Sequence, residues 1–266
     1  MKSVLFYFFE IPVYSYPIFF GLGFLFALFL ARKNATRLSL SVPQITDLWI
    51  VLLIAGIIGG KFGHVFIEAP SHLIEDPLHF LRLADSGYVF YGGLIGCLIT
   101  AFFYFKNRPQ INFWDYADAL ASPLFIGLAI GRLGCFFAGC CYGKATESFF
   151  GVIFPGHKQH VNPTQLYEMS ASLMIGISAY LLLLKRKFSG QIILWSVLIY
   201  TVIRPIIEVL RGDDDRGVYF DFLSTSQIIS VFIFAGCIWF LYKKNREVRN
   251  VNFNSNTGSE NSQLKQ

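Results

Sequence analysis

The chain has 266 residues, of which 54% are hydrophobic and 15% are charged. Soluble domains carry about 25% charged residues, so this composition excludes a soluble globular domain, and it also excludes a disordered or collagen-like chain. A polytopic membrane protein can carry so much apolar side chain because lipid covers it. The net charge is +5. Its basic residues lie in short clusters between apolar segments, which indicates membrane topology and not a nucleic-acid partner.

Seven apolar segments are long enough to cross a membrane as helices of about 20 residues. They fall at 15–31, 45–67, 88–105, 114–133, 164–184, 189–210 and 225–242. This pattern predicts an all-α polytopic membrane protein with a single transmembrane domain over residues 1–249. The polar residues 250–266 predict a disordered cytoplasmic tail.

The basic residues predict how the seven segments are oriented. Of the 22 Lys and Arg residues, 13 lie on one side of the predicted membrane, and the positive-inside rule makes that side cytoplasmic. The N-terminus is then outside and the C-terminus is in the cytoplasm. On the outer side, residues 68–87 predict an amphipathic arm. Residues 134–163, interrupted by Gly and Pro, predict a small outer head.

Polar side chains within the apolar segments gather in the predicted outer half of the membrane, and the inner half has almost none. Ionisable groups are costly in lipid and are usually functional there. The sequence therefore predicts one outward-facing site. Its candidate residues are Tyr16, Lys61, Tyr91, Arg132, Glu168, Arg204, Glu208 and Arg211.

The sixth apolar segment ends in a group of three charged residues. Arg204, Glu208 and Arg211 are separated by four and three residues, which places them on one face of a helix. An arginine at this depth needs an anion. Glu208 can supply one, and a lipid phosphate can supply another through a bidentate guanidinium contact. The alternative is an ion pair within the helix that has only a structural role.

The fourth apolar segment ends at Arg132, and a glycine-rich segment follows as far as Gly143. Glycines allow a backbone to approach a ligand closely, and free amides can hold a phosphate. The alternative is an arginine that extends to the interface before an ordinary turn. Glu168 follows Asn162 and Pro163, so it is either a functional carboxylate or part of the start of a helix.

Three of the five cysteines, Cys135, Cys140 and Cys141, lie close together in the sequence. A structural zinc site usually takes four protein ligands, and this spacing contains no paired C-x-x-C. We therefore expect no metal ion here. A disulfide on the outer side stays open as an alternative.

The segment GRLGCFFAGCCYG, from Gly131 to Gly143, resembles the diagnostic motif of the bacterial prolipoprotein diacylglyceryl transferases. Further segments resemble motifs of the same family in the same order, so the resemblance covers nearly the whole chain. These segments are Ser15-Tyr16 with Gly23, Gly59–Gly63, Asp76–Leu78, Phe90–Gly96, Pro163–Glu168, Arg204–Arg211 and Gln227.

This resemblance implies an activity. Enzymes of the family move the diacylglyceryl group of phosphatidylglycerol to the thiol of the lipobox cysteine in a preprolipoprotein signal peptide. The product is a thioether, and glycerol phosphate is released. The resemblance implies a location in the bacterial plasma (inner) membrane, with membrane lipid as a partner and without a cofactor. The alternative is a non-enzymatic lipid-binding or transport protein of the same fold.

The resemblance also implies roles for individual residues. Arg132 corresponds to the residue that binds the lipid phosphate, and Arg204 with Glu208 corresponds to a second essential charged pair. The full assignment is catalytic for Arg204, Glu208, Tyr91 and Tyr16, and phosphatidylglycerol-binding for Arg132, Cys135, Gly143, Arg211 and Glu168.

The chain departs from the family's pattern at several of these positions. Some members carry His in place of Tyr91, and Asn and Glu in place of Cys135 and Cys140. Ala138 stands where Asn is usual, and Lys61 stands in place of Arg. These differences leave open which group accepts the thiol proton.

Overall fold

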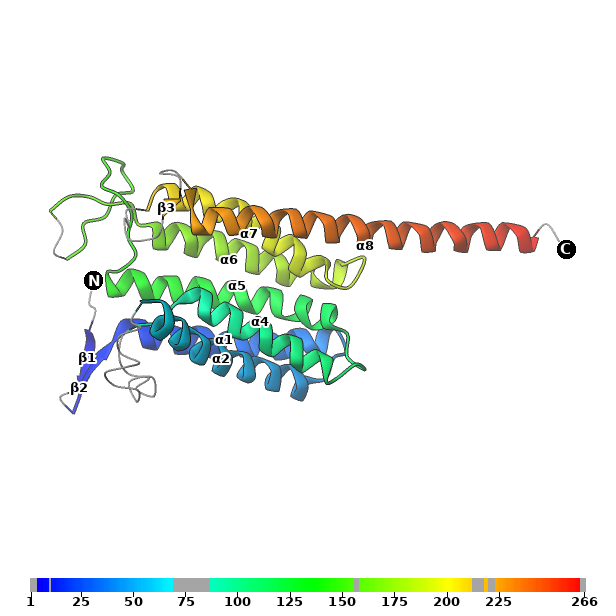
Figure 1. The fold of residues 1–266 in the computed structure, drawn as a ribbon, viewed down its shortest axis with the longest axis horizontal. Coiled ribbons are helices and arrows are strands. Elements are labelled where there is room, and N and C mark those ends of the chain that lie inside the picture. The colour runs from blue at the N-terminus through cyan, green and yellow to red at the C-terminus, as the bar shows by residue number, and fades with distance from the viewer. Residues whose placement is uncertain are drawn as a thin grey trace. The chain divides into compact units, whose positions relative to one another are not determined.

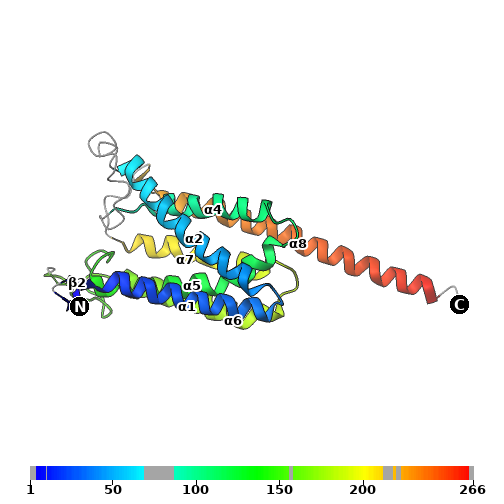
Figure 2. The ribbon, with the colours of Figure 1, turned by 90° about the horizontal axis from the view of Figure 1, so that it is seen from below.

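The computed structural model describes residues 4–9, 11–68, 87–155, 158–211, 218–219 and 223–263. Helices dominate these residues (Figures 1 and 2). The strands are β1 (Val4–Phe8), β2 (Ile11–Tyr14), β3 (Val218–Tyr219) and β4 (Leu223–Ser224). The α-helices are α1 (Ser15–Arg37), α2 (Val42–Gly63), α4 (Phe90–Lys106), α5 (Phe113–Ala138), α6 (Thr164–Leu182), α7 (Gln191–Val209) and α8 (Thr225–Gln263). Two short helices, η1 (His64–Glu68) and η3 (Leu183–Lys185), extend α2 and α6.

The helices agree with the predicted membrane-spanning segments. Six of them are long and apolar enough to cross a membrane, at 15–37, 42–67, 113–138, 164–185, 191–209 and 227–248. The third predicted segment is α4, an apolar helix of 17 residues. The described residues therefore form an all-α polytopic membrane protein, as the composition predicts.

The chain divides into two compact units. The first comprises Met1–Leu38 and Ala117–Gln266, and the second comprises Ser39–Tyr116. The first unit contains the antiparallel β1–β2 hairpin, α1, α6, α7, α8 and nearly all of α5. The second unit contains α2 and α4.

In the second unit, α2 and α4 pack through glycines. A Cβ atom added at Gly92 would lie 2.4 Å from the Gly59 carbonyl oxygen, and one added at Gly96 would lie 2.6 Å from the Ala55 carbonyl oxygen. Backbones this close leave no room for a side chain. The glycines around Lys61 and Tyr91 thus serve helix packing, as is typical of membrane helices.

In the first unit, α1 and α5 are joined by close packing and by a buried amide. A Cβ atom added at Gly23 would lie 3.1 Å from the Gly127 carbonyl oxygen. The Asn34 side-chain amide is fully buried and donates to the Ala119 carbonyl and the Ser122 hydroxyl, both at 2.9 Å. These bonds satisfy a polar group where no water is available.

Asp118 supports the start of α7. Its buried carboxylate accepts hydrogen bonds from the backbone amides of Gly190 (2.8 Å) and Ile193 (2.9 Å), and pairs with Arg186 at 2.8 Å. A carboxylate at a helix N-terminus satisfies amides that lack a partner within the helix. Asp118 therefore holds the turn between α6 and α7 in place.

One end of the first unit brings together segments that are far apart in the sequence. There α1 begins, α5 ends, α6 begins and α7 ends, and the segment that follows α5 lies beside them (Figure 1). This segment contains the isolated bridge Val152–Val161, and it is joined to the end of α7 by the bridge Gly143–Arg211. All of the predicted polar residues in the first unit belong to this end.

Two predictions, the outer arm and the disordered tail, are not decided by the described residues. The predicted arm at 68–87 lies outside the described residues except at its two ends. Helix α8 continues to Gln263 (Figure 2), and our expectation that residues 250–266 are disordered in solution stays a prediction.

Candidate functional site

The centre of the site is the carboxylate of Glu168 on α6. Its side chain is 1% exposed, and its Oε1 atom accepts hydrogen bonds from Arg132 Nη2 at 2.9 Å and from the Tyr200 hydroxyl at 2.7 Å. Arg204 Nε lies 4.0 Å from the same oxygen. The Glu168 carboxylate on α6 therefore links α5 and α7 to its own helix through ion pairs and a hydrogen bond. It does not cap its own helix.

Arg204 makes a second ion pair, with Glu208 one turn further along α7, at 2.5 Å. The side chains of Arg204 and Glu208 are 12% and 9% exposed. The four-residue spacing in the sequence predicts this contact, and the structure confirms it. Because Arg204 also faces Glu168, the pair is part of a larger charged network and is not confined to one helix.

Four buried atoms of this network have no hydrogen-bond partner among the described residues. Two of them, Arg204 Nη1 and Glu208 Oε2, face each other in the ion pair on α7. The other two are Nε of Arg132 and Oε2 of Glu168. A buried donor without a partner costs about 1–3 kcal/mol, and more when it is charged. Arg132 therefore has a buried donor that its ion pair with Glu168 does not use.

The segment after α5 is held against the start of α6 by two buried side chains. The Thr164 hydroxyl donates to the Cys141 carbonyl at 2.8 Å, and the Gln165 amide donates to the Cys140 carbonyl at 2.6 Å. Gly139 and Cys141 have positive φ angles of 73° and 64°. A left-handed conformation is uncommon for a residue other than Gly, so Cys141 is kept in it by its surroundings.

Gly143 lies where three segments meet. Its amide donates to the Asn162 carbonyl at 2.8 Å, and it forms an isolated bridge with Arg211. A Cβ atom added at Gly143 would lie 2.3 Å from the Leu210 carbonyl oxygen. Only Gly fits here, and it brings the buried Arg211, which lies beyond the end of α7, next to the segment that follows α5.

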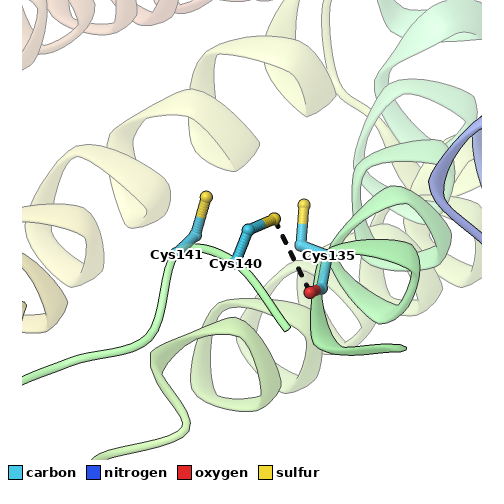
Figure 3. Close-up of side chains that lie close together, drawn as sticks. All are labelled: Cys135, Cys140 and Cys141. Carbon is cyan, nitrogen blue, oxygen red and sulfur yellow. Dashed lines mark hydrogen bonds between the residues drawn. The ribbon is translucent and has the colours of Figure 1, made fainter. Parts of the chain in front are cut away.

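The three clustered cysteines converge. The sulfur atoms of Cys135, Cys140 and Cys141 all lie within 4.8 Å of one another, and they point to the same side of the backbone (Figure 3). All three are free thiols. The pKa of Cys141 is lowered by its side-chain contacts with Cys135 and Cys140 and by the nearby positive charges of Arg211 and Arg132. The pKa of Cys140 is raised by its contacts with the other two thiols.

The two tyrosines among the predicted site residues, Tyr16 and Tyr91, belong to different units. Tyr16, in the first turn of α1, lies close enough to Cys135 and Arg132 for its hydroxyl to interact with them electrostatically. Tyr91 lies in the first turn of α4 and belongs to the second unit, where its ring contacts Phe90 edge-on. The structure thus brings together all the predicted site residues of the first unit. Tyr91 belongs to the second unit.

Sequence reasoning missed Tyr200 and Gln165. Tyr200 precedes Arg204 by four residues and Glu208 by eight, so its position on the charged face of α7 could have been found from this spacing. Gln165 sits next to Thr164 at the start of α6, and the sequence carries no signal that its amide reaches back to Cys140.

These features define a class: a polytopic membrane protein in which buried arginines from two helices share one buried carboxylate, beside a loop fixed by glycine. The comparisons with known proteins agree. The sequence profile of the prolipoprotein diacylglyceryl transferases matches residues 3–243. The chain is 34% identical over 240 residues to the phosphatidylglycerol–prolipoprotein diacylglyceryl transferase of Clostridium tetani, covering 87% of this chain and 93% of that protein.

Other relatives carry the same name. A second phosphatidylglycerol–prolipoprotein diacylglyceryl transferase, from Clostridium perfringens, is 33% identical over 252 residues, which is 92% of this chain and 96% of that protein. The one from Aeromonas hydrophila is 31% identical over 237 residues, 86% of each chain. The chain belongs to the prolipoprotein diacylglyceryl transferase family. A non-enzymatic transporter of the same fold is therefore not favoured.

Proposed function

We propose that this protein transfers the diacylglyceryl group of phosphatidylglycerol to the lipobox cysteine thiol in the signal peptide of a preprolipoprotein. The acceptor sulfur attacks the glycerol carbon that carries the phosphate ester, a C–S bond forms, and the C–O bond to phosphate breaks. The bonding electrons stay on the phosphate oxygen of the released glycerol phosphate. The observation that carries the proposal is the buried Arg132–Glu168–Arg204 network in a chain of this family.

The two arginines have distinct tasks in this reaction. The unpartnered Nε of Arg132 is the donor for the lipid phosphate, and Glu168 holds the guanidinium so that this edge stays available. Arg204, held between Glu168 and Glu208, stabilises the charge that develops on the leaving phosphate. Removal of one such group costs about 100- to 1,000-fold in rate, because charge stabilisation in a site without water is strong.

We propose a network that includes Glu208 as the acceptor of the thiol proton, through water. A thiol with a pKa of ~8.5 is mostly protonated at neutral pH, so a base or another activating group is needed. An ordinary phenol has a pKa of ~10 and is a poor base in this pH range, so we assign Tyr91 to substrate positioning. Tyr16, Cys135, Gly143 and Arg211 complete the assigned site around the lipid headgroup.

The topology belongs to the same proposal. We infer an inner-membrane location, an outer N-terminus, a cytoplasmic C-terminus and a site toward the outer leaflet, which the thiol reaches after export. The exposed Lys187 follows η3 on the predicted cytoplasmic side. A membrane-impermeant thiol reagent should leave Lys187→Cys unlabelled in intact cells and label it after permeabilisation, as read by peptide mass spectrometry. Labelling in intact cells would reverse the orientation.

The test of the activity uses purified protein, phosphatidylglycerol and a lipobox peptide, with the product identified by mass spectrometry. Arg132→Ala and Arg204→Ala should each reduce transfer by at least ~100-fold. Lysine at either position should restore little activity, since it lacks the planar fork of a guanidinium. Arg246→Ala, at an exposed position on α8, is the matched control and should transfer normally. Wild-type protein that forms no thioether would refute the proposed function.

A further inference from the structure

The structure assigns a second role to the thiol cluster. We propose that Cys135, Cys140 and Cys141 form a zinc site with one open coordination position, and that the acceptor thiol of the substrate binds there. The identity of this fourth ligand rests on the proposed function. The three-sulfur site itself rests on geometry alone.

The spacing of the sulfurs suits a single ion. Zinc binds thiolate sulfur at about 2.3 Å, so three sulfurs on a tetrahedral zinc lie about 3.8 Å apart. In the structure all three lie within 4.8 Å of one another. Closing the remaining distance of up to roughly 1 Å requires only small side-chain rotations. Soft thiolate ligands favour zinc over the hard cations magnesium and calcium.

The backbone already holds the sulfurs in this arrangement. Cys135 lies in the last turn of α5, and the chain reverses at Gly139 so that Cys140 and Cys141 return beside it (Figure 3). Cys141 keeps a φ angle of 64°, a conformation that costs of order 1–3 kcal/mol and that recurs at functional sites. Ligands that are positioned before the ion arrives need little further ordering.

Hydrogen bonds from α6 support the same backbone. Thr164 and Gln165 are each 1% exposed, and they donate to the carbonyls of Cys141 and Cys140. These bonds fix the backbone that carries two of the three sulfurs. In known metal sites, loss of the outer contacts that orient a ligand weakens metal binding about 10- to 100-fold, and we expect the lower end of this range here. The cluster therefore has supporting contacts as well as ligands.

The number of ligands determines what kind of metal site is possible. Among the described residues the cluster offers three sulfurs and no fourth ligand, whereas a closed structural site takes four protein ligands. The sequence predicts no metal for the same reason. A site with three protein ligands instead leaves the fourth position to water or substrate. Cys135 is buried, Cys141 is half-buried and Cys140 is exposed, so an incoming thiol can reach the ion from the side of Cys140.

The surrounding charge is compatible with such a centre. Three thiolates and Zn²⁺ carry a net charge of −1. Arg132 and Arg211 both lie near Cys141, and they compensate this charge. The cluster also lies beside the proposed phosphate donor, because Arg132 and Cys135 are three residues apart on one face of α5.

The site would activate the thiol without redox chemistry. The acceptor cysteine binds zinc as thiolate, and its proton passes through water to the network that includes Glu208. Its sulfur then forms the C–S bond while the C–O bond to phosphate breaks, and zinc stays Zn²⁺ throughout. Coordination thus lowers the pKa of the substrate thiol, so that the thiol gives up its proton more readily.

The first experiment measures metal binding by the full chain in detergent micelles, reduced and stripped with a chelator. One Zn²⁺ per chain should bind, as counted by elemental analysis, and Co²⁺ in its place should show sulfur-to-cobalt charge-transfer absorption. Cys140→Ser should weaken binding by more than about 100-fold, since it removes a ligand itself. Cys237→Ser, at a buried position on α8, is the matched control and should bind normally.

Cys140 is exposed, so its replacement should not unfold the protein, and thermal unfolding in the same micelles checks this. Thr164→Val provides a second variant that keeps all three sulfurs and should bind Zn²⁺ about 10-fold more weakly. Zinc bound at much less than one ion per chain, or bound equally by Cys140→Ser, would overturn the site.

The second experiment tests the open position. A lipobox peptide with cysteine should change the Co²⁺ spectrum, whereas the same peptide with serine in its place should not. An unchanged spectrum would overturn the fourth-ligand assignment. The transfer assay separates the two proposals: normal turnover by metal-free protein would overturn activation by zinc while the proposed function stands. Failure of both metal-loaded and metal-free protein to transfer would refute the function, and the Co²⁺ spectra would still decide the metal site.

Discussion

Replacing Glu168 by glutamine tests whether one buried carboxylate holds the site together. The substitution keeps the size of the side chain and removes its charge. Arg132 and Arg204, whose side chains are 19% and 12% exposed, then lose the anion that they share. Arg204 keeps Glu208, whereas Arg132 keeps no ion-pair partner among the described residues.

The expected loss of stability follows from these contacts. Removing one partner of a buried ion pair costs about 3–5 kcal/mol, because the other charge is left uncompensated. The amide oxygen introduced by Glu168→Gln still accepts one hydrogen bond, from Tyr200 or from Arg132, which offsets about 1 kcal/mol. We therefore expect the free energy of unfolding to fall by about 2–4 kcal/mol. Transfer should fall by at least ~100-fold, because Arg132 is no longer held in place.

Two further variants make the comparison quantitative. Tyr200→Phe removes one hydrogen bond to Glu168 and leaves the charge, so it should cost about 1–3 kcal/mol. Glu247→Gln breaks an exposed ion pair with Lys244 on α8 and should cost less than about 1 kcal/mol. Reversible unfolding in mixed micelles, followed by tryptophan fluorescence, measures all three. Equal stability of Glu168→Gln and Glu247→Gln would refute the reasoning.

Three more outcomes follow from the structure. Gly143→Ala should lower transfer by at least ~10-fold, because the added Cβ atom would displace the backbone next to Arg211, and misplaced catalytic groups reduce the rate. Gly21→Ala is the control: no atom lies within 4 Å of its added Cβ atom, so it should behave as wild type. Tyr91→Phe should retain activity within roughly 10-fold, the value of one hydrogen bond, and complete loss at every pH would make Tyr91 the proton acceptor. Asp118→Asn should lower the free energy of unfolding by about 1–3 kcal/mol without changing kcat, and a changed kcat in fully folded protein would contradict a purely structural role.

The sequence by itself determined the class of fold, the apolar helices and the family. Apolar segments of helical length can only be covered by lipid or by one another, so composition and spacing suffice for that conclusion. Contacts within one helix can also be predicted directly from the sequence. The pair of Arg204 and Glu208 is set by the pitch of an α-helix, which brings residues four apart onto one face.

Only the tertiary structure decided which distant groups share a site. Glu168 meets Arg132 and Tyr200 across 36 and 32 residues of sequence, and helical periodicity carries no information about which helices are neighbours. The three sulfurs converge because Gly139 and Cys141 turn the backbone through positive φ angles and because side chains of α6 hold that turn. Both features depend on how helices pack, which local sequence preferences leave undetermined. For that reason the sequence predicted the charged residues and the grouping of three cysteines along the chain, but neither the central place of Glu168 nor the convergence of the three sulfur atoms.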